Sequence, residues 1–133
     1  HLGDLAVAER RLRESTRLLT ELGIVFSLAT ALEQYAVLFT AAGRPELAGR
    51  VWGAAEALRD RLGTPLEPFA ALEKVRWTRQ AAERAGPAAF EAALHEGRSM
   101  PAEAARDLAL REAAALAVPL TGEGPARAGV TAA

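Results

Sequence analysis

Four glycines recur at a constant spacing and divide the first half of the chain. They stand 20 residues apart, where one apolar-periodic stretch stops and another begins: Gly3, Gly23, Gly43 and Gly63. Because glycine readily takes the left-handed conformation that closes a helix, this spacing predicts helices over residues 4–22, 24–42 and 45–62. Asp4 is the expected N-cap of the first helix, and Pro45 suits the first turn of the third.

The composition favours the same all-α fold class. Almost a quarter of the 133 residues are alanine, the strongest helix former. The 16 basic and 17 acidic residues leave a formal charge of -1, so the chain has no field that would attract nucleic acid or an anionic membrane. Cysteine is absent, which excludes disulfides and thiolate metal sites. Since no apolar run approaches membrane-spanning length, we expect a soluble cytoplasmic protein without a cofactor.

The small and apolar residues follow helical spacing and form one stripe on each helix. Superposing residues 3–23 on 43–63 pairs six identical residues, which indicates an internal repeat. A helix with one apolar stripe must cover it against a neighbour, and helices of equal length joined by short turns do so as an antiparallel stack. The stripe of the first helix comprises Leu5, Ala8, Leu12, Ser15, Leu19 and Leu22.

The 20-residue spacing of the glycines ends after Gly63. Two prolines, Pro65 and Pro68, make residues 64–68 a loop. Further helices are expected over 69–85 and 88–96, and a last helix is expected to end near 117. From Pro119 onward there is almost nothing to bury, so 119–133 is interpreted as a flexible tail or linker. The predicted organisation is one helical domain over 1–118, with a repeat part at 3–63 and an irregular C-terminal cap at 64–118.

The repeat resembles the tetratricopeptide (TPR) pattern, in which large and small residues alternate at fixed positions on two helices. The positions that match are Leu32, Tyr35, Ala36 and Phe39 on one helix and Gly43, Ala48, Trp52 and Ala55 on the next, preceded by Gly3, Ala8, Leu12 and Ser15. The period is 40 rather than about 34, and Thr20 or Asp60 replaces the proline that normally ends a repeat. The resemblance therefore implies a lengthened relative, a TPR-like α-solenoid fragment built as a stack of antiparallel helix pairs.

A narrower resemblance covers residues from about 43 to 117. These residues look like the end of the helical-repeat region of large bacterial ATP-dependent regulators, several of which are LuxR-type transcription factors. In that family an ATP-binding module precedes the repeats, and a helix-turn-helix domain often follows a linker. Neither module is recognisable in these residues, so the resemblance implies an interaction or sensing module rather than ATP hydrolysis or DNA binding. The matching segments are residues 52–56, 62–65, 90–93 and 96–98.

Little in the sequence points to catalysis, metal binding or nucleic-acid binding. His95 is the one internal histidine, and it lies near a predicted helix end where a cation complements the helix dipole. No cluster with metal-ligand spacing accompanies it. The oppositely charged pairs Glu9/Arg13 and Arg17/Glu21 are interpreted as solvated helix faces. We therefore predict a protein that is not an enzyme and that does not itself contact nucleic acid.

Aromatic residues are the remaining candidates for a binding surface. Core packing is the favoured interpretation for Tyr35, Phe39 and Trp52, which fall at space-filling repeat positions. Arg76 and Trp77 lie in a charged stretch that is typical of an interface rim. We expect the groove or its rim to involve Trp77, Arg76 and Tyr35, and its occupant to be a peptide or a small-molecule effector.

The first helix corresponds to the second helix of a repeat, so its partner helix would precede residue 1. We therefore expect its uncovered edge to be buried by upstream repeats of a parent protein or by a second copy of the chain. That edge comprises Leu5, Leu12, Leu18 and Leu19. The predicted function is a non-catalytic interaction or sensing module of a bacterial transcriptional regulator. The alternatives are a free-standing structural or dimerisation domain without an effector and, third, a small helical enzyme.

Overall fold

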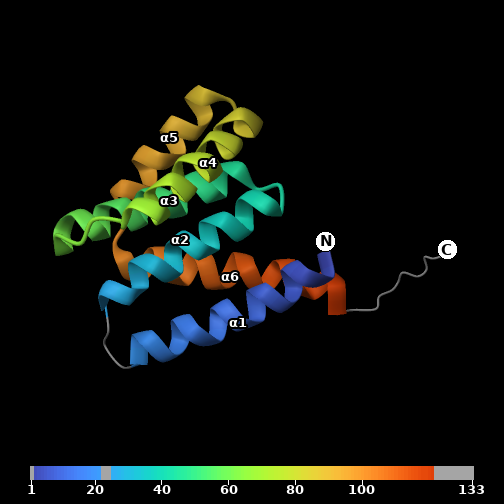
Figure 1. Cartoon of the computed structure of the whole chain (residues 1–133). Coiled ribbons are helices and arrows are strands. Elements are labelled where there is room, and N and C mark those ends of the chain that lie inside the picture. Colours follow the sequence, from blue (N-terminus) through green and yellow to red (C-terminus); the bar gives the residue numbers. More distant parts are fainter. Residues whose placement is uncertain (1, 22–24, 122–133) are drawn as a thin grey trace.

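The computed structural model of the chain describes the backbone of residues 2–21 and 25–121, and the side chains of residues 2–17 and 28–116. Within these residues the chain is helical and contains no strand, which confirms the all-α fold class (Figure 1). None of the described helices combines the length and the apolar run needed to cross a bilayer. The helices are α1 (Leu2–Glu21), α2 (Val25–Ala41), α3 (Pro45–Leu62), α4 (Pro68–Ala85), α5 (Pro87–Arg98) and α6 (Ala102–Thr121).

Two of the four periodic glycines mark helix ends as expected. Gly43 has a φ of 80° and Gly63 a φ of 67°, so both take the left-handed conformation that stops α2 and α3. Gly3 is different because α1 already begins at Leu2, which places Gly3 inside the helix and Asp4 in its first turn. The prediction of Asp4 as an N-cap is therefore wrong. Gly23 lies outside the described residues.

The helix boundaries in the second half agree with the proline pattern. Pro45, Pro68 and Pro87 each occupy the first position of a helix, where the missing N–H costs nothing. The last helix extends further than expected, since α6 continues to Thr121 rather than ending near 117. Residues 119–121 of the predicted tail therefore belong to α6, and residues 122–133 lie outside the described part.

The core forms around α3, which contacts α2, α4, α5 and α6. Ten of the 18 residues of α3 are buried, because neighbours cover it on several sides. Large side chains of α2 fill the space beside it, and the rings of Tyr35 and Phe39 stack with centroids 6.1 Å apart. Small residues at Ala36, Ala48 and Ala55 are fully buried and let the helices approach closely.

The α3–α5 crossing depends on glycine. A Cβ atom added to Gly53 would overlap the carbonyl oxygen of Leu94, and one added to Gly97 would overlap the carbonyl oxygen of Arg50. The two backbones therefore touch where neither residue has a side chain. A third glycine, Gly49, faces the Phe90 ring rather than backbone atoms.

The first and last helices pack against each other. Figure 1 shows α1 and α6 at one side of the molecule and α4 and α5 at the other. The buried face of α6 is made of small residues at a spacing of four: Ala105, Ala109 and Ala113. The sequence pattern does not predict that α6, nearly a hundred residues away in sequence, packs on α1, and the predicted edge at Leu5 and Leu12 stays only half-buried beside this contact.

The buried face of α1 differs from the predicted one. Among the described side chains of α1, the buried ones are Ala6, Glu9 and Thr16, although the sequence pattern predicts burial of the stripe that contains Leu5 and Leu12. Those two leucines are only half-buried, at the groove between α1 and α2. The face that carries Glu9 and Thr16 is enclosed where α1 packs against α2 and α6, and Tyr35 of α2 lies beside it.

Glu9 is the one fully buried carboxylate among the described side chains, and it is not the solvated residue that its spacing to Arg13 suggests. Arg13 lies 3.3 Å away, but no described group donates a hydrogen bond to either carboxylate oxygen. Burial raises the pKa of Glu9, and the charges of Arg13 and Arg10 partly offset this effect. Arg17 bonds Glu14 at 3.0 Å, and the side chain of Glu21, its predicted partner, lies outside the described residues.

Replacing Glu9 should stabilise the fold at neutral pH. We expect Glu9→Met to raise the free energy of unfolding by about 1 kcal/mol at pH above the folded-state pKa, because it removes a buried charge. The gain should shrink as pH falls toward the ordinary carboxyl value of 4.5, because the folded state binds the proton more tightly than the unfolded state. Urea unfolding of both proteins across this range checks the prediction, and a gain that grew on acidification would contradict it.

Candidate functional site

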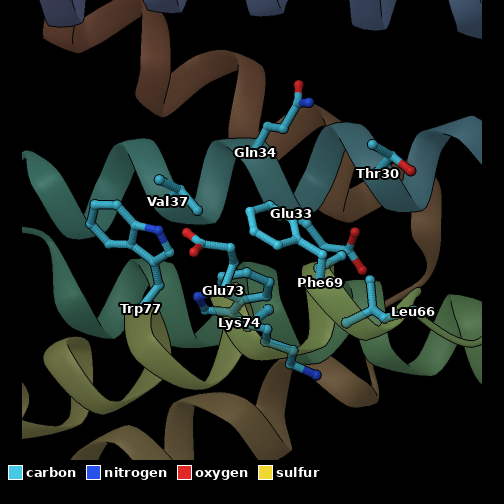
Figure 2. Close-up of a pocket in the computed structure, with 11 residues that line it drawn as sticks. Thr30, Glu33, Gln34, Val37, Leu66, Phe69, Glu73, Lys74 and Trp77 are labelled. Carbon is cyan, nitrogen blue, oxygen red and sulfur yellow. The ribbon is translucent and has the colours of Figure 1, made fainter.

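An open pocket lies between α2 and α4, over α3, with a volume of about 280 Å³. Its apolar wall comes from three helices and the loop before α4 and includes Val37, Trp52, Leu66, Phe69, Ala70 and Trp77. Figure 2 shows Phe69 and Trp77 of α4 facing Val37 of α2 across the opening. This size is at the lower end of the range for small-molecule sites, about 300–1,000 Å³.

The three aromatic side chains of the pocket differ in exposure. Trp52 is 3% exposed and forms part of the core. Phe69, at 73% exposure, is the most exposed large apolar side chain of the described residues. Trp77 is half-buried between these extremes. The Trp52 indole N–H has no acceptor among the described residues. The pocket therefore combines a fixed aromatic floor with a solvated aromatic rim.

The carboxylate of Glu33 on the α2 side is fully engaged. Arg59 of α3 donates from Nε to Glu33 Oε2 at 2.6 Å and from Nη2 to Oε1 at 3.0 Å. The same guanidinium reaches Thr30 Oγ1 and the Thr64 carbonyl oxygen, each at 3.0 Å. The hydrogen bonds that Arg59 donates to Glu33 raise the pKa of Arg59. This clamp ties α2 to α3 and to the turn that leads into α4.

Lys74 of α4 is also engaged, on the opposite side of the pocket. Its ammonium group bonds the carboxylate of Glu56 and lies 5.8 Å from the centroid of the Trp52 ring. Arg98 of α5 donates to the other oxygen of Glu56 at 2.9 Å and to Asp60 at 2.7 Å. These hydrogen bonds raise the pKa of Arg98. The network links α3, α4 and α5 below the pocket.

Among the charged groups of the pocket, Glu73 has the most distant ion-pair partner. Its carboxylate lies 3.6 Å from Arg76, whose side chain is 71% exposed and extends over the Trp77 ring at 5.9 Å. In Figure 2 the Glu73 carboxylate lies between Phe69 and Trp77 and points toward Val37, whereas the Lys74 side chain points the other way. The structure therefore places an incompletely paired carboxylate inside an aromatic pocket.

A second concavity of about 400 Å³ lies between α1 and α2. Gln34 and Val37 line both pockets, so the exposed face of α2 forms a ridge between them. The α1 wall consists of Leu5, Ala8, Arg11, Leu12 and Ser15.

The predicted groove residues fall in different places. Trp77 lines the α2–α4 pocket, and Arg76 stands at its edge. Tyr35 does not reach either groove, since it is fully buried beside Thr16 of α1. Burial raises the pKa of Tyr35 to about 12, so its phenol stays neutral at physiological pH. His95 is exposed in the last turn of α5.

The predicted edge residues are only partly described. Leu5 and Leu12 line the α1–α2 concavity, and the side chains of Leu18 and Leu19 lie outside the described residues. Sequence reasoning missed Phe69 and Glu73. The available signal was their spacing to Trp77, because residues four and eight apart share one face of a helix.

Among the described residues, no group of histidine and acidic side chains is arranged to hold a metal ion. The arrangement of the α2–α4 pocket suits binding through apolar contact and one carboxylate. Comparison of the chain with protein-family models, with curated proteins and with solved structures gave no match.

Proposed function

We propose that this chain is a non-catalytic sensing module that binds a small, largely apolar ligand in the α2–α4 pocket. The observation that carries the proposal is the pocket itself, an open concavity of about 280 Å³ with an aromatic floor and rim. Exposed aromatic side chains gathered around a concave site are typical of ligand recognition, because an isolated domain gains nothing by leaving them in water.

The unequal burial of the helices supports a sensing role. Ala81 is the one buried residue of α4, whereas α3 and α5 are locked together at their glycine crossing. A ligand between α2 and α4 would therefore bias the position of α4 at low cost and leave α3 and α5 in place. We place this module among the helical repeats of a bacterial LuxR-type regulator, where such a shift would pass to neighbouring modules.

The two tryptophans of the chain both line the pocket, so intrinsic fluorescence reports directly on its occupancy. Titration with phenylbutanol should give a saturable change in emission. Phe69→Ala should weaken binding about tenfold, because the ligand loses apolar contact at the rim. The matched control is Leu72→Ala, since Leu72 is equally exposed on α4 at 71% but does not line the pocket. A non-saturable response, or equal effects of the two variants, would contradict the proposal.

A second candidate is protein binding at the α1–α2 concavity. Leu5, Ala8, Leu12 and Ser15 recur at intervals of three and four residues along its wall, which is the spacing that a docked helix would contact. The predicted peptide effector, upstream repeat or second copy would occupy this site. A free-standing structural domain, in contrast, would leave both concavities without a ligand and would give no saturable fluorescence change.

A further inference from the structure

We infer that the α2–α4 pocket selects ligands that carry a positive charge on an apolar body, such as a protonated amine attached to an aromatic or aliphatic group. The inference rests on the proposed function, because it specifies the chemistry of the ligand in the same pocket. The juxtaposition that carries it is the Glu73 carboxylate between Phe69 and Trp77 (Figure 2).

The other charged groups at the pocket are already satisfied within the protein. Glu33 receives two short hydrogen bonds from Arg59, and both side chains are largely buried, at 12% and 16% exposure. Lys74 is held by Glu56 and directed away from Val37. Glu33 is therefore not available to bind a ligand cation, because Arg59 already occupies it. Lys74 is likewise not available to bind a ligand anion.

Glu73 differs because its partner is easily displaced. Arg76 approaches it at 3.6 Å, beyond hydrogen-bond distance, and the Arg76 side chain is 71% exposed. An exposed pair of this kind contributes little stability, so exchanging Arg76 for a ligand cation costs little. The exchange brings the carboxylate a closer, less hydrated partner whose apolar body covers Phe69 and Trp77.

The aromatic surroundings add to this preference. A ring face attracts a cation within about 6 Å of its centroid, and Arg76 already uses the Trp77 face in this way at 5.9 Å. Lys74 does the same at Trp52. The Trp77 face therefore becomes available to a ligand cation when Arg76 is displaced, whereas Lys74 keeps the Trp52 face, and an anionic ligand would meet the Glu73 carboxylate instead.

A series of three ligands with one apolar body tests the inference: phenylbutylamine, phenylbutanol and phenylbutyrate, titrated by tryptophan fluorescence at neutral pH. We expect the amine to bind about tenfold more tightly than the alcohol, and the carboxylate more weakly than either. Glu73→Gln should reduce the preference for amine over alcohol to less than about threefold. Arg76→Gln should act in the opposite direction and tighten amine binding, because it removes the internal competitor.

The matched control is Glu83→Gln, which removes an exposed carboxylate of α4 that does not line the pocket and should leave all three affinities unchanged. Equal binding of amine and alcohol, or an amine preference that survives Glu73→Gln, would overturn this inference while leaving the proposed function intact. Absence of saturable binding by all three ligands would overturn both.

Discussion

Gly97→Ala should lower the free energy of unfolding by about 3 kcal/mol and the melting temperature by roughly 10 °C. Alanine is the better helix former by about 1 kcal/mol, so propensity alone predicts the opposite sign. The steric effect dominates because the new methyl group would overlap the Arg50 carbonyl oxygen, a backbone atom that cannot turn aside. Gly53→Ala should behave alike, through the carbonyl oxygen of Leu94. Thermal unfolding followed by circular dichroism measures both variants.

Gly49→Ala is the matched control, since it lies on the same helix one turn before Gly53. Its added Cβ would meet the Phe90 ring at 3.1 Å and the Ala93 Cβ at 3.2 Å, so the misfit is only a few tenths of an ångström and involves no backbone atom. We expect its stability to stay within about 1 kcal/mol of the parent. If all three substitutions had the same effect, backbone contact would not be what holds α3 against α5.

Arg59→Ala should cost roughly 2 kcal/mol of stability. The substitution removes four hydrogen bonds and leaves the Glu33 carboxylate, 12% exposed, without its counter-ion. Charge-assisted, bidentate hydrogen bonds are stronger than neutral ones, and an unpaired group in a largely buried site keeps its desolvation cost. Urea unfolding of the parent and variant gives the difference directly.

The control for this prediction is Arg61→Ala, because Arg61 is exposed on the same helix and forms no ion pair with a described residue. Its effect should stay within about 0.5 kcal/mol. The double variant Arg59→Ala with Glu33→Leu should recover part of the loss, since an apolar side chain does not require a counter-ion. A loss in Arg61→Ala as large as that in Arg59→Ala would indicate a general charge effect rather than this clamp.

The sequence predicts the helices well because their boundaries depend on local features. Glycine at 43 and 63 and proline at 45, 68 and 87 fix the ends through backbone geometry, which any single sequence reveals. The errors at Gly3 and Asp4 have the same origin. Superposition of 3–23 on 43–63 assumes that Gly3 and Gly43 are equivalent, and nothing local shows that α1 begins at Leu2, two residues before the predicted start.

The tertiary errors concern contacts between residues distant in sequence. Alanines at a spacing of four on α6 are suited to close packing against another helix. Their spacing does not show which helix that is. The sequence pattern therefore predicts a buried stripe at Leu5 and Leu12 and a solvated Glu9, whereas the structure buries Glu9 and leaves the two leucines half-buried. Tyr35 is buried, as the core-packing interpretation predicts, and only its expected place at the groove is wrong, since it lies beside Thr16 of α1.

The candidate site was only half predictable for a related reason. The charged stretch around Trp77 and Arg76 predicts an interface rim, and both residues lie at the α2–α4 pocket. The importance of Glu73 depends on two other pairings, Glu33 with Arg59 and Lys74 with Glu56, which join different helices. Glu73 can therefore be identified as the weakly paired carboxylate only when the ion pairs of the folded structure are known.

Nuclear magnetic resonance of nitrogen-15-labelled protein during titration with phenylbutylamine tests the central claim most directly. If the ligand binds in the α2–α4 pocket, the chemical shifts of the Trp52 and Trp77 indole N–H groups should change together with those of backbone amides of α4 and of the exposed face of α2. The amides of Gly53 and Gly97, at the rigid α3–α5 crossing, should stay in place. Indole signals that do not respond, or shifts centred on another part of the molecule, would contradict the assignment of this pocket as the binding site.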